Sequence, residues 1–186
     1  MLGTRLALEL FREGTMHISL SDLMDYTDWE RRKWNQWFRQ RDKQPLEISV
    51  GPHRDERFQS VGDWVRHIFA AEIRYVERLC GQPLTDPASI PTDNVEALFE
   101  FGQRSRKELR KLLETFPASE WDAAKDFKIL NYSVKATPKK IVVHILLHEI
   151  RHWAQIATLL RQNGFVDEFH DFLASPVMGG EWRREQ

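Results

Sequence analysis

The sequence predicts an all-α fold, a four-helix bundle of the up-and-down type with short N-terminal and C-terminal extensions. Four stretches of about 20 residues each repeat apolar side chains at helical spacing. Connections of about 10 to 20 residues separate them, as in helical bundles. Each stretch begins near a residue that caps helices, and three end at a glycine or a proline. We therefore expect residues 1–186 to form a single domain, with the bundle covering about residues 18–175.

The composition is typical of a globular protein with little net charge. The formal net charge is −1 and the isoelectric point is about 6.7, so no basic field favours nucleic acid or an anionic membrane. No apolar run reaches the length of a transmembrane helix, and residues 1–14, a predicted short helix, lack the pattern of a signal peptide. The single cysteine, Cys80, excludes a disulfide framework and suits a reducing compartment. We expect a cytoplasmic protein that binds neither nucleic acid nor membrane.

The first predicted helix runs from Ser19 or Ser21 to about Arg41. Its apolar face includes Trp34, and we assign its arginines, Arg31 among them, to the solvent face. Arginines interleaved with tryptophans can indicate RNA binding, but the neutral net charge favours an ordinary solvated face.

The second predicted helix, Ser60 to Leu79, carries two polar residues of interest. Glu72 lies near the centre of the apolar arc, and His67 lies at its edge. An unpaired carboxylate in a core is costly, so Glu72 requires a cation, a metal-bound ligand or a raised pKa. The alternative is that the helix rolls slightly and Glu72 reaches solvent or an arginine.

The third predicted helix begins at Thr92 or Asp93 and ends near Phe116. We assign residues 122–136 to a loop that can contain a short strand, and residues 42–57 to a linker with a short extended piece. The tail is expected to form a turn of helix around residues 168–173. Two histidines of these irregular regions are assigned to solvent, His53 and His170.

The fourth predicted helix begins at Thr137 and Pro138 and ends at Gly164. His144, His148 and His152 recur in it every four residues and fall within its apolar stripe. Buried imidazoles require polar partners, and a metal ion is one suitable partner. His144 lies about 12 Å along the axis from His152, too far for both to bind one ion.

A metal site on His148 and His152 therefore needs a third ligand from another helix, and His67 is the best candidate. Gln155 shares the stripe of the two histidines, and Glu72 or Gln155 would lie close by as an outer contact or a substrate contact. The two histidines could instead bond to each other, to Glu72 or to water without any metal. Their shared stripe favours the metal interpretation.

His148 to His152 also match the H-E-x-x-H pattern of zinc proteases, in which the glutamate is the general base. Arg151 is untypical within that pattern, and the chain has too few predicted strands for the usual protease site. Glu149 lies about 100° around the helix from His148, so we expect it to point away from an ion. The protease is the weakest hypothesis.

Three segments resemble the DinB-like superfamily of metal-dependent enzymes, also called damage-inducible or YfiT-like. The second helix reads WVRHIFAAEIRYVERLCGQP, which is similar to the family's histidine with a glutamate five residues later. The fourth reads HILLHEIRHWAQIATLLRQNG, similar to the family's H-x-x-x-H followed by glutamine. The first, LMDYTDWERRKW, resembles the family's opening helix, and the resemblance covers about residues 18–175.

The resemblance implies a three-histidine metal site on His67, His148 and His152. It also implies relatives that transfer or isomerise groups with a low-molecular-weight thiol such as bacillithiol, mycothiol or glutathione. Trp153 and Ala154 stand where the family often has arginine and glycine. Arg151 stands where an aromatic residue or histidine is common, and these departures concern the substrate and not the ligands.

We accordingly expect a divalent metal ion, with zinc or nickel favoured and iron or manganese also suitable. The expected function is a metal-dependent thiol transferase, or a related hydrolase, that acts on a small molecule; no catalytic residue is assigned. The expected assembly is a homodimer. The alternative is a bundle that binds metal without catalysis or is purely structural.

Overall fold

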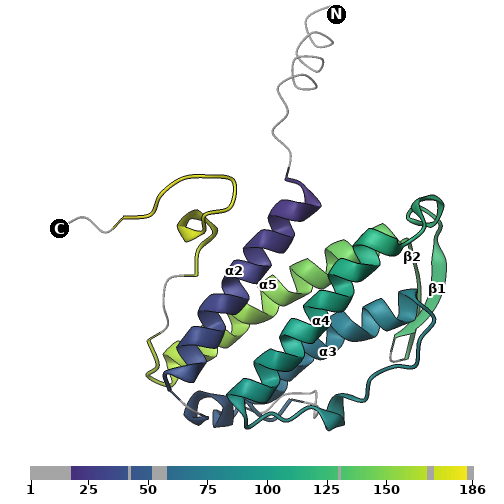
Figure 1. Cartoon of the computed structure of the whole chain (residues 1–186). Helices are drawn as coiled ribbons and strands as arrows, with labels where there is room; N and C mark the ends of the chain where they lie inside the picture. The colour runs from purple at the N-terminus through teal and green to yellow at the C-terminus, as the bar shows by residue number, and fades with distance from the viewer. Residues whose placement is uncertain (1–17, 42, 52–57, 130, 167–169, 184–186) are drawn as a thin grey trace, which may run out of the picture.

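The computed structural model describes residues 18–41, 43–51, 58–129, 131–166 and 170–183. Four long helices pack side by side (Figure 1): α2 (Leu20–Arg39), α3 (Val61–Leu79), α4 (Val95–Thr115) and α5 (Pro138–Gln162). The predicted all-α four-helix bundle is confirmed. None of the described helices is long and apolar enough to cross a membrane.

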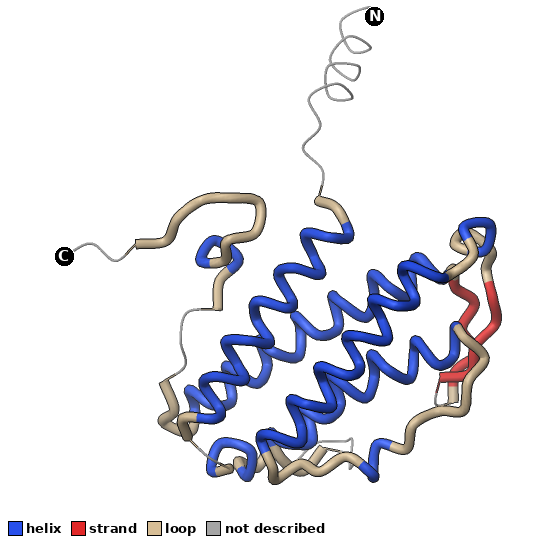
Figure 2. The backbone as a smooth tube through the Cα atoms, in the orientation of Figure 1, coloured by secondary structure: helices blue, strands red, loops and turns tan. Residues whose placement is uncertain are grey.

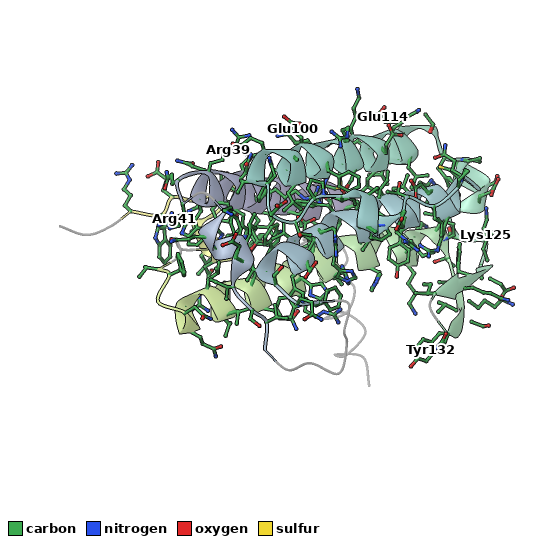
Figure 3. All side chains as sticks on the ribbon, turned by 90° about the horizontal axis from the view of Figure 1, so that it is seen from below. Arg39, Arg41, Glu100, Glu114, Lys125 and Tyr132 are labelled. Carbon is green, nitrogen blue, oxygen red and sulfur yellow. The ribbon has the colours of Figure 1, made fainter. Side chains whose placement is uncertain are left out.

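A β-hairpin and four short 3-10 helices complete the described structure. Strands β1 (Lys125–Ile129) and β2 (Tyr132–Ala136) pair antiparallel and lie together at one end of the bundle (Figure 2). Tyr132 lies at the tip of the hairpin and points away from the helices (Figure 3). The segment that we predicted as a loop with a short strand is thus a two-stranded hairpin. The 3-10 helices are η1 (Gln44–Glu47), η2 (Pro87–Ser89), η3 (Ala118–Glu120) and η4 (Phe172–Ala174).

Capping side chains fix the starts of the helices. Ser60 caps α3 in a capping box with Asp63, and Thr137 caps α5 by accepting from the amide of Lys140, as predicted. Gly164, with φ of +82°, follows the last turn of α5, where a left-handed conformation favours glycine.

The structure selects one of the two predicted starts of α2, and the start of α4 differs from the prediction by one or two residues. Ser19 and not Ser21 caps α2, because only Ser19 is followed three residues later by the acidic Asp22 that completes a capping box. Asn94 caps α4 in place of Thr92 or Asp93, because its side chain accepts from the amide of Ala97.

Helix α3 packs against both α4 and α5. The connection of residues 80–94 returns along the bundle, so α3 and α4 run in the same direction (Figure 1). Contacts agree, because Phe69 packs on Phe99 and Glu72 bonds to Ser105 further along both helices. Helices α2 and α3 therefore run antiparallel, and so do α4 and α5, as in the predicted up-and-down bundle. The neighbouring helices α3 and α4 instead run parallel, because the connection between them crosses over the length of the bundle.

The core is divided into two apolar clusters with a polar layer between them. One cluster contains Trp34 and Trp153, and the other contains Leu109 and Leu146. On every long helix, a buried polar residue lies in sequence between the residues of one cluster and those of the other. These polar residues are Arg31 on α2, Glu72 on α3, Ser105 and Arg106 on α4, and Glu149 on α5.

The tail folds back against α2. His170 is half-buried and stacks on Trp34 with 4.1 Å between ring centroids, so its predicted exposure is wrong. The predicted turn of the tail is present as η4. Residues 1–14, with their predicted helix, and His53 lie outside the described residues, as does the 167–169 part of the tail.

Candidate metal centre

Three histidines come together at the seam between α3 and α5. The Nε2 atom of His148 lies 3.1 Å from that of His67 and 3.0 Å from that of His152. His148 and His152 lie one turn apart on α5, and the antiparallel packing of α3 places His67 opposite them. They form the one group of three or more potential metal-binding side chains within 4.8 Å of one another in the described part of the chain. The three residues that the sequence selected are therefore adjacent.

The convergence of these nitrogens fits a shared ion better than hydrogen bonds. Each ring nitrogen carries either one hydrogen or one lone pair, so His148 Nε2 can make one good hydrogen bond, yet it faces two nitrogens. Nitrogens that share one ion at about 2.1 Å lie about 3.0 to 3.4 Å apart. The two spacings of 3.1 and 3.0 Å fall at the short end of that range, so the residues present fit a divalent metal.

The environment of His148 and His152 keeps both imidazoles neutral, the form that binds metal. Burial, followed by the charges of the neighbouring imidazoles and Arg151, lowers the pKa of His148 to about 2. Burial and then Arg151 lower the pKa of His152 to about 4, and Gln155, as an acceptor for the protonated ring, opposes that shift. Near pH 7 both rings are therefore uncharged.

An open groove begins beside the histidines. It has a volume of about 540 Å³, and Trp64 and Arg151 lie in its wall together with Gln155. The Trp64 ring lies 6.1 Å from the His152 ring, so the groove and the histidine cluster are neighbours. Gln155 lines the groove three residues after His152 on α5, next to the histidine cluster, where the sequence predicted a site neighbour.

His144 stays outside the cluster, as its distance along the helix predicted. It is exposed, with its ring 5.4 Å from that of His148. Its Nε2 atom lies 3.4 Å from the hydroxyl of Tyr75.

Glu149, the glutamate of the H-E-x-x-H pattern, faces the interior of the bundle. It is 1% exposed, and its carboxylate accepts from Arg31 at 2.5 and 2.8 Å and from Arg106 at 2.7 Å. The indole of Trp153 donates a further bond at 3.1 Å. Both oxygens are thus engaged away from the histidines, so the structure gives no support for a protease base at this position.

Glu72 belongs to the same buried polar layer. It is 1% exposed and accepts from Arg31 at 3.0 Å and from the hydroxyl of Ser105. Arg106 lies 3.2 Å from its second oxygen. Of the alternatives considered for Glu72, pairing with arginine is the one observed, and its bonds run to this layer and not to the imidazoles.

Sequence reasoning missed the arginines of this layer. Arg31 was assigned to solvent but is 8% exposed and lies over the Phe69 ring, so that assignment is wrong. A signal was available, because Arg31 stands four residues after Thr27 and three before Trp34, on the buried stripe of α2. Glu72, a carboxylate predicted near the centre of an apolar face, also required a cation.

A third acidic residue near this layer is uncharged at neutral pH. Burial, and then the charge of Glu149, raise the pKa of Glu30 to about 9. Arg31 and Arg106 already pair with Glu72 and Glu149, and none of the ion pairs among the described residues involves Glu30.

Comparison with known proteins agrees with the geometry. The sequence model of the DinB family matches residues 16–184. The chain belongs to the DinB family. A search of curated proteins found no match.

Two solved structures share the fold of this DinB-family chain. A DinB-like protein from Bacillus cereus ATCC 10987 superposes with a TM-score of 0.57 at 15% identity, covering 76% of this chain and 91% of that protein. A DinB-like protein, YjoA, from Bacillus subtilis gives a TM-score of 0.53 at 16% identity, covering 81% and 96%. At these identities the likeness establishes the fold alone.

Proposed function

We propose that this protein is a metal-dependent enzyme that binds one divalent ion through His67, His148 and His152. The observation that carries the proposal is that His148 Nε2 faces two other Nε2 atoms at once. When bound, the ion supplies a positive centre that lowers the pKa of a thiol or of water. Zinc or nickel suits three imidazoles best, and iron or manganese also fits.

The reaction that we propose is transfer of a low-molecular-weight thiol to a small electrophile, or a related hydrolysis. The chain's own thiol is poorly placed for this role, because Cys80 caps the far end of α3 from His67, and burial raises its pKa. The sulfur would therefore come from a small molecule. Trp64 and the ring of Phe58, 4.8 Å from His67, provide an apolar wall that limits water near the site.

The electrostatics of the site support activation of a thiol. Imidazole ligands are neutral when they bind metal, so they would leave the charge of the ion intact, and Glu72 and Glu149 are held by arginines in the interior. Gln155 lies beside His152, in the wall of the groove. We further propose that the protein acts in the cytoplasm as a homodimer, without nucleic acid or a membrane, in line with its net charge of −1.

Elemental analysis of protein purified without a histidine tag tests the metal site. We expect about one metal ion per chain, lost in His148→Ala and retained in His144→Ala, because His144 lies on the same helix but outside the cluster. A wild-type protein without metal, even after incubation with zinc or nickel, would overturn the proposal. A panel of thiols and electrophiles, with and without metal, then separates an enzyme from a bundle that only binds metal.

A further inference from the structure

One cation beside the three histidines has no anionic partner within the described part of the chain. Arg151 is exposed, lines the groove beside the histidines and makes no ion pair with any residue that the structure describes. It stands three residues after His148 and one before His152, and side chains three apart on a helix are neighbours. Its guanidinium is therefore available to a ligand in the groove.

The charges described at the site favour an anionic ligand. Imidazoles bind metal in their neutral form, so they would not offset a divalent ion, and Arg151 adds a further positive charge. Among the described carboxylates of α3 and α5, Glu72 and Glu149 pair with arginines in the interior, and Asp63 pairs with Arg66. A ligand that carries two anionic groups would neutralise both positive centres.

We propose that the groove selects a substrate with a carboxylate, which Arg151 binds while the thiol of the same molecule lies at the histidines. The inference rests on the proposed metal site. A guanidinium matches a carboxylate in a planar, two-bond geometry. The rest of the substrate packs on Trp64 and Leu159, which lie in the same wall. A groove of about 540 Å³ has the size typical of sites for small ligands.

Binding of two matched thiols to the cobalt-loaded protein tests this specificity. The probes are 3-mercaptopropionate and 3-mercapto-1-propanol, which differ in the carboxylate, and thiolate-to-cobalt absorption reports their binding at fixed pH and salt. We expect the carboxylate probe to bind about tenfold more tightly in the wild type, the effect of one charged hydrogen-bonded pair. In Arg151→Gln that ratio should fall to about one, and Arg151→Lys should keep part of it.

The ratio of the two affinities isolates the contribution of the carboxylate, because a substitution that alters the bound ion or the pKa of a bound thiol changes the affinity of both probes. Lys140→Gln is the matched control, since it removes one exposed positive charge from the first turn of α5, far from the groove, and should leave the ratio unchanged. If cobalt binds and both thiols bind equally well to the wild type, the carboxylate inference is wrong and the metal site stands. The inference is equally wrong if Arg151→Gln keeps the preference. If cobalt does not bind, the proposed function and the inference fail together.

Discussion

Replacing Glu149 with glutamine is predicted to destabilise the fold by about 3 to 5 kcal/mol, the usual cost of leaving a buried charge without its partner. Glu149 accepts three bonds from Arg31 and Arg106, and both arginines are buried, so little solvent can replace those bonds. Glutamine keeps the shape but offers one acceptor, and its amide hydrogens face the guanidinium groups. For a chain of this length the loss corresponds to a fall in Tm of about 6 to 20 °C.

Urea denaturation followed by helical circular dichroism measures this loss. The protein is kept in a chelator, so that metal binding does not contribute to the free energy of unfolding. Glu114→Gln is the matched control, because Glu114 lies on the outer face of α4 (Figure 3) and makes no ion pair with the described residues. It should change stability by less than about 0.5 kcal/mol.

The same experiment separates two roles for Glu149. A catalytic base would leave stability unchanged when it becomes glutamine, whereas a partner of buried arginines cannot. If Glu149→Gln unfolds within about 0.5 kcal/mol of the wild type, the argument that the polar layer is held by this carboxylate is refuted.

Three further predictions concern the stability of the protein. Glu30→Gln should stabilise the protein by up to about 3 kcal/mol at pH 7. The pKa of Glu30 is raised to about 9, so its contribution to stability is present below pH 4.5 and is lost as the pH rises toward 9. Urea denaturation across that pH range should therefore show that the stability advantage of Glu30→Gln grows with pH. A difference in stability that stays constant with pH would contradict the raised pKa. Gly102→Ala should lower stability by about 1 to 3 kcal/mol, since the new Cβ would lie 2.8 Å from the Phe69 ring; an unchanged unfolding midpoint would show that the ring moves freely. Zinc or nickel at 100 times its dissociation constant should raise the free energy of unfolding by about 2.7 kcal/mol, and His152→Ala should abolish that gain in a thermal shift assay.

The sequence predicted the features that depend on spacing within one helix. The pairing of His148 with His152, the caps Ser60 and Thr137, and the exclusion of His144 follow from positions along single helices, and the structure agrees with each. His67 lies on another helix and was selected as the best third candidate; the structure places it beside the other two. Helical spacing does not fix how neighbouring helices are rotated against each other. The pairing of Glu72 and the burial of Arg31 depend on that rotation, so the first was left open and the second was wrong.

Contacts between distant segments were also out of reach. His170 is covered because the tail returns to Trp34, 136 positions earlier in the chain, and no local pattern indicates that return. The hairpin of residues 125–136 depends on pairing between two short strands of mixed polarity, with exposed and half-buried residues alternating in β1. Such weak alternation is hard to distinguish from a loop.

The rotation of α5 and of α3 about their axes explains both the buried polar layer and the candidate metal centre. Glu149 follows His148 by about 100° around α5, and His152 lies about 40° from His148. Once two arginines hold Glu149 toward the interior, both imidazoles are turned to the seam with α3. On α3, Glu72 stands about 140° from His67, so its bonds to Arg31 and Ser105 turn His67 to the same seam.

This arrangement separates the groups that orient the ligands from the ligands themselves. The carboxylates fix the rotation of α3 and α5 without contacting the imidazoles through any bond that the structure describes, so they leave the ion's charge undiminished for an anionic substrate. A carboxylate bound to the ion in place of a histidine would fix the site equally well but would weaken its attraction for a thiolate. Holding Glu72 and Glu149 in the interior therefore gives the site both a defined geometry and the positive charge that its proposed chemistry requires.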